Sequence, residues 1–125
     1  MKMKFIHTTA YTRDLEKCLD FYTNVMGLEV VQRFQTPDGK EIAFLDAGNG
    51  VKIEFIQYAN GYAPAVEKMP SWAFEPEDFD AMLKYIEESD EYRVEQGPVE
   101  VPGGRFFFFC DFNGIYIQIM EHYEK

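Results

Sequence analysis

Four residues of this 125-residue chain have side chains that suit metal chemistry, and their spacing relates them in pairs. His7 and Glu54 lie in segments that alternate like β-strands, and a shift of 64 residues leads from them to Ser71 and Gln118. A glutamate flanked by apolar residues is costly to bury unless it is paired or bound to a metal. We expect the four side chains to converge, and such nitrogen and oxygen donors suit a divalent ion such as Zn, Ni, Co, Mn or Fe.

Two other interpretations of these polar residues stay open. His7 and Glu54 could simply hydrogen-bond each other across adjacent strands in a fold that holds no metal. Glu75 and His122 share the predicted face with the four residues, and either could reach a shifted ion. If neither binds an ion, Glu75 is an acid at the start of a helix and His122 is a solvated histidine near the C-terminus.

The 64-residue shift also relates the two halves of the chain as a whole. It aligns Asp14 with Asp78 and the turn dipeptide Asn49-Gly50 with Asn113-Gly114. Few residues are identical, but the pattern of expected elements repeats in the same register, which indicates a duplicated unit.

Each half is expected to contain one helix and four strands. The first helix buries Leu15, Cys18, Leu19 and Tyr22, is capped by Thr12 or Asp14 and ends at Gly27, and the second buries Phe79, Met82, Leu83 and Ile86. The strands are expected at residues 4–11, 28–36, 41–46, 51–58, 71–75, 92–101 (bent at Gly97-Pro98), 105–111 and 115–123.

This order predicts an α+β fold of two βαβββ modules in tandem, with curved mixed sheets enclosing a cleft and the helices outside. We expect one domain, residues 1–125, made of module one (1–58), a linker (59–70) and module two (71–125).

Strand parity predicts which side chains line the cleft. The apolar rows, expected against the helices, are Ile6–Thr8–Ala10, Ile53–Phe55, Trp72–Phe74 and Ile115–Ile117–Ile119. The opposite rows mix polar and aromatic residues and suit a small-molecule site, with Tyr11, Tyr58 and Met120 as substrate contacts.

Composition and charge exclude several partners. The formal net charge is −10, so the chain repels nucleic acids and anionic membranes. Cys18 and Cys110 lie in apolar patterns and are expected to be buried thiols. The longest apolar run is too short to span a bilayer, and no signal peptide is evident, so we expect a soluble, cytoplasmic protein.

Several motifs resemble a known family. FIHTT at residues 5–9, DLEK at 14–17 and LDFYTNVMGL at 19–28 resemble the opening of glyoxalase I (lactoylglutathione lyase), and DFNGIYIQI at 111–119 resembles the closing motif of the vicinal oxygen chelate superfamily. The superfamily includes bleomycin resistance proteins and dioxygenases. The resemblance covers nearly the whole chain.

The resemblance implies a metal site that this chain retains only in part. His7 and Glu54 match the family's first two ligands, whereas Ser71 and Gln118 replace a histidine and a glutamate. A glutamine can ligate through its amide oxygen but cannot act as a base, so Glu54 is the remaining candidate base. Extradiol dioxygenases of the superfamily need two histidines and a glutamate as metal ligands. The four candidate residues of this chain include only one histidine.

The resemblance leaves two functions open. The first is a metal-dependent, glyoxalase-I-like lyase or isomerase for a small α-oxygenated carbonyl compound. Tyr11 and Tyr58 stand where glyoxalase I has glutathione-binding Arg and Asn, which argues against glutathione and favours an apolar or aromatic ligand. The second is a non-catalytic resistance or sequestering protein that binds a small organic molecule. Members of the family often form homodimers, and we expect the same here.

Overall fold

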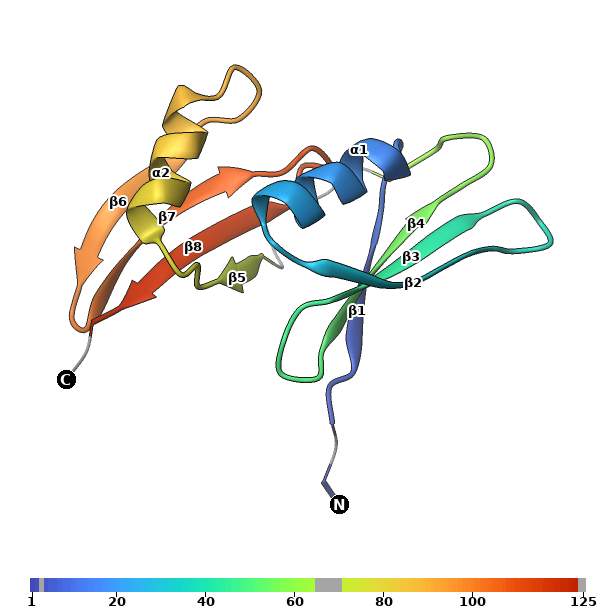
Figure 1. Ribbon diagram of the computed structural model, residues 1–125, viewed down its shortest axis with the longest axis horizontal. Helices are drawn as coiled ribbons and strands as arrows, with labels where there is room; N and C mark the ends of the chain where they lie inside the picture. Colours follow the sequence, from blue (N-terminus) through green and yellow to red (C-terminus); the bar gives the residue numbers. More distant parts are fainter. Residues whose placement is uncertain (3, 65–70, 124–125) are drawn as a thin grey trace. The chain divides into compact units, whose positions relative to one another are not determined.

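The computed structural model describes residues 1–2, 4–64 and 71–123. The chain divides into two compact units, Met1–Pro64 and Ala65–Lys125. Residues 65–70 of the predicted linker lie outside the described residues. The first unit contains strand β1 (His7–Tyr11), helix α1 (Leu15–Asp20), the π-helical turn η1 (Phe21–Val25), and strands β2 (Glu29–Gln35), β3 (Glu41–Asp46) and β4 (Lys52–Gln57) (Figure 1).

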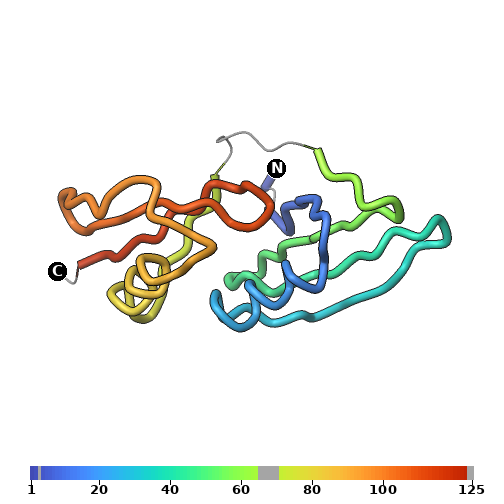
Figure 2. Tube along the Cα trace, turned by 90° about the horizontal axis from the view of Figure 1, so that it is seen from above, coloured from blue at the N-terminus to red at the C-terminus, as the bar shows by residue number. Residues whose placement is uncertain are grey.

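The second unit repeats this order. It contains strand β5 (Trp72–Phe74), helix α2 (Phe79–Glu88), and strands β6 (Gln96–Val101), β7 (Gly104–Cys110) and β8 (Tyr116–His122). Figure 2 follows the repeated order along the trace, from blue to green in the first unit and from yellow to red in the second. The predicted α+β class with two βαβββ modules is therefore confirmed.

Both sheets are mixed and share one topology. The strand orders are β1-β4-β3-β2 and β5-β8-β7-β6, in which the first two neighbours are parallel and the others antiparallel. The register also repeats with the 64-residue shift. Thr9 pairs with Glu54 in the first sheet as Ala73 pairs with Gln118 in the second. The same side-chain positions are thus available on each sheet.

The repeat in register breaks only at the outer strand of the second sheet, among the strand pairs described. Gln96 pairs with Phe108, but Val99 then pairs with Phe106, so a bulge lies between Gln96 and Val99. A Cβ atom on Gly97 would lie 2.8 Å from the carbonyl oxygen of Phe106. Glycine is therefore needed where the bulge brings the two backbones together.

Each helix begins at an aspartate and buries most of its predicted face. The carboxylates of Asp14 and Asp78 accept hydrogen bonds from the backbone N–H groups of Lys17 and Ala81 at 3.1 and 3.0 Å. The predicted face of α1 and η1 is buried, as are Phe79, Met82 and Ile86 of α2, whereas Leu83 is only half-buried. The helical segment of the first unit stops at Gly27, whose φ of 76° places it in the left-handed region.

One face of each sheet is apolar and buried. Ala43 and Phe55 in the first sheet, and Phe107 and Ile117 in the second, are fully buried. The apolar rows predicted in β4 and β8 are thereby confirmed. The expectation for Ile6 is wrong, since 58% of this residue is exposed: β1 begins at His7, and Ile6 lies before the paired strand. No helix among the described residues is long and apolar enough to cross a membrane.

Candidate functional site

The face of the first sheet opposite its apolar row carries His7 and Glu54, the two predicted ligands of the first unit. In a parallel pair, residues in register point to the same side of the sheet, so Thr9 and Glu54 share a face. Alternation along β1 places His7 and Tyr11 on this face with them. We call this surface the open face of the first unit.

His7 and Glu54 approach each other on the open face. Nε2 of His7 lies 3.8 Å from Oε1 of Glu54, and the Thr9 hydroxyl donates a 2.7 Å hydrogen bond to the same oxygen. The side chain of Glu54 is 15% exposed and that of His7 is 38% exposed. The imidazole also stands edge-on to the ring of Phe44, with centroids 5.5 Å apart. These contacts position an imidazole and a carboxylate side by side.

Ser71 and Gln118, the equivalent pair of the second unit, are both uncharged. Ser71 directly precedes β5, and Gln118 lies in β8 in register with Ala73. Because Ala73 replaces Thr9, the second unit has no hydroxyl at the position that holds Glu54 in the first. Gln118 is half-buried beside Phe108 of the next strand. The second unit therefore offers a hydroxyl and an amide where the first offers an imidazole and a carboxylate.

Tyr11 and Tyr58 stack on each other. Their ring centroids are 5.2 Å apart and their planes differ by 8°. A hydrogen bond with Tyr58, the largest contribution, raises the pKa of Tyr11 above its ordinary value. The structure brings these two residues together as a pair. Whether they bind a substrate stays a prediction.

Glu75 and His122 form a second pair, at positions that the repeat relates to Tyr11 and Tyr58. Oε2 of Glu75 accepts a 2.9 Å hydrogen bond from the backbone N–H of His122 and lies 3.2 Å from its Nδ1. These hydrogen bonds lower the pKa of Glu75. The pair is largely exposed, with side chains 50% and 65% accessible.

Gln118 and Met120 share the face of the second sheet opposite its buried row, which we call the open face of the second unit. Met120 lies there beside an aromatic cluster. It is half-buried and pairs with Phe106 across β7 and β8. Phe106 and Phe108 meet edge to face at 5.7 Å, and Phe108 stacks on Tyr116 at 4.8 Å. Both units thus present aromatic rings on the face opposite their apolar rows.

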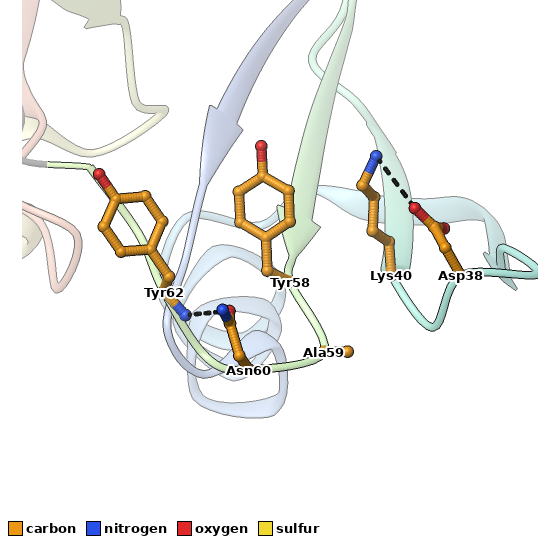
Figure 3. Close-up of a pocket in the computed structure, with 6 residues that line it drawn as sticks. All are labelled: Asp38, Lys40, Tyr58, Ala59, Asn60 and Tyr62. Carbon is orange, nitrogen blue, oxygen red and sulfur yellow. Dashed lines mark hydrogen bonds and ion pairs between the residues drawn. The ribbon is translucent and has the colours of Figure 1, made fainter.

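A pocket of about 460 Å³ in the first unit contains residues that the sequence analysis did not single out (Figure 3). Lys40 follows the turn between β2 and β3, and Tyr62 follows a turn after β4 in which its N–H bonds to Asn60 at 3.0 Å. The Asn60-Gly61 dipeptide was a signal for that turn. The residues that line the pocket are Asp38, Lys40, Tyr58, Ala59, Asn60 and Tyr62.

His7 and Glu54 fit a divalent ion as one half of a site. Bonds of roughly 2.0–2.2 Å from an imidazole nitrogen and a carboxylate oxygen to one ion are compatible with donors this close. In the part of the chain that the structure describes, no three His, Cys, Asp or Glu side chains are grouped to hold a metal. Further protein donors in the predicted set are the oxygens of Ser71 and Gln118, which are weaker ligands than an imidazole or a carboxylate.

A match to a family model defines the class of protein to which the chain belongs. Residues 4–119 match the model of the Glyoxalase/Bleomycin resistance protein/Dioxygenase superfamily. The chain belongs to this superfamily, as the motifs indicated.

Relatives with curated sequences cover the chain to different extents. The uncharacterized protein YwbC of Bacillus subtilis is 26% identical over 125 residues, which cover 97% of this chain and 99% of that protein. The lactoylglutathione lyase of Neisseria meningitidis serogroup A is 40% identical over 61 residues. That match covers 48% of this chain and 44% of the lyase, so it relates less than half of each protein.

Solved structures share the fold. The trypanothione-dependent glyoxalase I of Leishmania major has a TM-score of 0.79 at 21% identity, covering 96% of this chain and 87% of that one. TnmS3, an antibiotic binding protein from Streptomyces sp. CB03234, has a TM-score of 0.75 at 20% identity, covering 98% and 99%. Enzymes and binding proteins thus use the same scaffold.

Proposed function

We propose that the protein is a metal-dependent, glyoxalase-I-like lyase or isomerase acting on a small α-oxygenated carbonyl compound. The observation that carries this proposal is the approach of His7 to Glu54 on the open face, with Thr9 bonded to the carboxylate. The 40% identity to a lactoylglutathione lyase over 61 residues supports the same class of reaction.

His7 and Glu54 would hold the ion, with the oxygens of Gln118 and Ser71 as weaker donors. A bound divalent ion supplies Lewis-acid polarisation of two neighbouring substrate oxygens. The Thr9 hydroxyl fixes Oε1 of Glu54 and thereby orients the carboxylate. Oε2 of Glu54 is then the atom that we assign to take a proton from the substrate carbon, since the amide of Gln118 cannot accept it.

Metal content and turnover test this proposal together. Purified protein is analysed for transition metals, and is then assayed with the methylglyoxal-derived hemithioacetal and added Ni, Zn, Co or Mn. We expect near-stoichiometric metal and turnover in the wild type, and loss of both in His7→Ala and Glu54→Gln. Absence of turnover with every one of these metals would rule out a hemithioacetal lyase of the strict glyoxalase I type. His122→Ala changes the only other histidine of the chain. If His122→Ala loses the metal and His7→Ala keeps it, the metal is bound at His122 and not at His7.

A ligand-binding function without chemistry is the second candidate, and the stacked Tyr11–Tyr58 pair beside the pocket favours it. Wild-type protein that binds no metal yet binds an organic ligand would support this function over the first. Cytoplasmic location and a homodimer are also part of the proposal. Sedimentation of the purified chain tests the dimer.

A further inference from the structure

The pocket of the first unit is lined by residues from two connections of the chain. Asp38 and Lys40 come from the connection between β2 and β3, while Tyr58, Asn60 and Tyr62 follow β4. All of them belong to one compact unit. The described residues that line the pocket therefore all lie in the first half of the chain.

Three tyrosines form a row that ends in the pocket. Tyr58 stacks on Tyr11 on one side, and its centroid lies 6.2 Å from that of Tyr62, at an interplanar angle of 38°. Tyr62 is 60% exposed. An exposed ring at the end of an aromatic row offers a flat surface on which another planar ring can stack.

The polar groups of the pocket lie at one end of its side chains. Figure 3 shows the Lys40 ammonium and the hydroxyls of Tyr58 and Tyr62 directed the same way. Nζ of Lys40 is 5.6 Å from the centroid of the Tyr58 ring and 3.5 Å from Oδ2 of Asp38. An ammonium and two phenols are hydrogen-bond donors, so this end suits an acceptor with negative charge.

The local charge limits how much negative charge the ligand can bring. Asp38 already offsets part of the Lys40 charge, and the whole chain carries a formal net charge of −10. A group with two negative charges, such as a phosphate, would meet net repulsion here. A single carboxylate fits the one ammonium and its neighbouring phenols better.

We propose that this pocket binds a planar aromatic carboxylate, with the ring on Tyr62 and the carboxylate at Lys40 and the Tyr58 hydroxyl. Tyr58 lies four residues beyond Glu54, which is roughly 13 Å along a strand. The pocket would therefore hold the distal part of a ligand and not its reacting atoms. Only this division into a distal part and a reacting part rests on the proposed function. Binding of an aromatic carboxylate in the pocket needs no metal.

Calorimetry with 2-naphthoate as the probe tests the assignment, in buffer with a chelator so that no metal contributes. We expect saturable binding to the wild type, and binding at least about tenfold weaker for cyclohexanecarboxylate, which lacks the flat ring, and for 2-naphthalenemethanol, which lacks the charge. Tyr62→Ala and Lys40→Met should each weaken 2-naphthoate binding by about tenfold or more. Tyr85→Ala and Lys84→Met, exposed positions on α2 of the other unit, are the matched controls and should bind as the wild type does.

Amide NMR of the wild-type protein keeps the test decisive if a variant fails to fold. Addition of 2-naphthoate should shift the amide signals of Lys40, Asn60 and Tyr62. Absence of saturable binding, or equal binding of cyclohexanecarboxylate, would overturn the assignment. The calorimetry measures no turnover, so failure of the proposed lyase activity would not affect this binding result. Failure of 2-naphthoate to bind would likewise not decide whether the protein is a lyase.

Discussion

The rings of Tyr11 and Tyr58 stack 5.2 Å apart, and the repeat puts Glu75 and His122 at the equivalent positions of the second unit, where they also contact each other. The duplicated scaffold thus brings the same two strand ends together twice. In one unit the contact joins two phenol rings, and in the other it joins a carboxylate to an imidazole. The two open faces therefore offer different chemistry at related places.

The Glu75–His122 pair leads to a prediction about titration. The backbone N–H of His122, the largest cause, and its side chain hold the pKa of Glu75 below its ordinary value of 4.5. A carboxyl whose pKa is lower in the folded than in the unfolded state stabilises the fold above the unfolded pKa. We expect this contribution to disappear as the pH falls below 4.5 and through the folded pKa.

Carbon-detected NMR titration of the Glu75 carboxyl measures this shift. His122→Ala should raise the pKa of Glu75 only part of the way to 4.5, because the backbone N–H remains. His7→Ala, in the other unit, should leave the titration unchanged. A pKa for Glu75 that is the same in wild type and His122→Ala would mean that the side-chain contact has no effect.

A second prediction concerns the start of α1. The side chain of Gln57 accepts a 2.6 Å hydrogen bond from the backbone N–H of Leu15, which adds to the Asp14 cap. Gln57→Ala should lower the free energy of unfolding by about 1 kcal/mol, measured by urea denaturation. The matched variant is Glu121→Ala at the equivalent position, where the side chain instead pairs with Arg105 near the surface. It should cost under about 1 kcal/mol, and a larger loss than that of Gln57→Ala would contradict this view of the cap.

Much of the fold could be predicted because strand alternation and the repeat both depend on local pattern. The 64-residue shift predicted which residues of the two halves are equivalent, and the pairs Thr9–Glu54 and Ala73–Gln118 lie at such equivalent positions. Ile6 was assigned wrongly because alternation continues before the first strand, whereas pairing starts only at His7. Burial at a strand end depends on its neighbours, which the pattern does not contain.

The candidate site could be predicted in part for the same reason. Parity placed His7 and Glu54 on one face, and the structure brings them to 3.8 Å. The sequence did not predict that Lys40 and Tyr62 line one pocket, because their meeting depends on the course of two connections and not on a strand period. Parity also indicated that Tyr11 and Tyr58 share a face, but ring orientation, which makes them stack on each other, is a property of side-chain packing.

A third prediction tests the positioning of Glu54 by Thr9. Thr9→Val removes the hydroxyl that bonds to Oε1 of Glu54 and keeps the shape of the side chain. Loss of such a supporting hydrogen bond should weaken metal binding by about tenfold, measured by competition with a chromogenic chelator. Thr8→Val, on the opposite face of the same strand, is the control and should retain wild-type affinity. Equal affinities in Thr9→Val and wild type would show that this hydroxyl does not tune a metal ligand.

The last prediction is a gain of metal affinity from changes in the second unit. Gln118→Glu replaces an amide by a carboxylate, and Ser71→His adds an imidazole beside it; both new groups are stronger ligands for borderline divalent ions. If the proposed site draws donors from both units, the double variant should bind Ni²⁺ at least about tenfold more tightly than the wild type. Because the new ligands must be deprotonated to bind, the gain should shrink as the pH falls. Gln35→Glu, at an exposed position in β2, adds the same charge elsewhere and should bind Ni²⁺ as the wild type does. An unchanged affinity in the double variant would separate the second pair from the ion and leave His7 and Glu54 as the only ligands among the four.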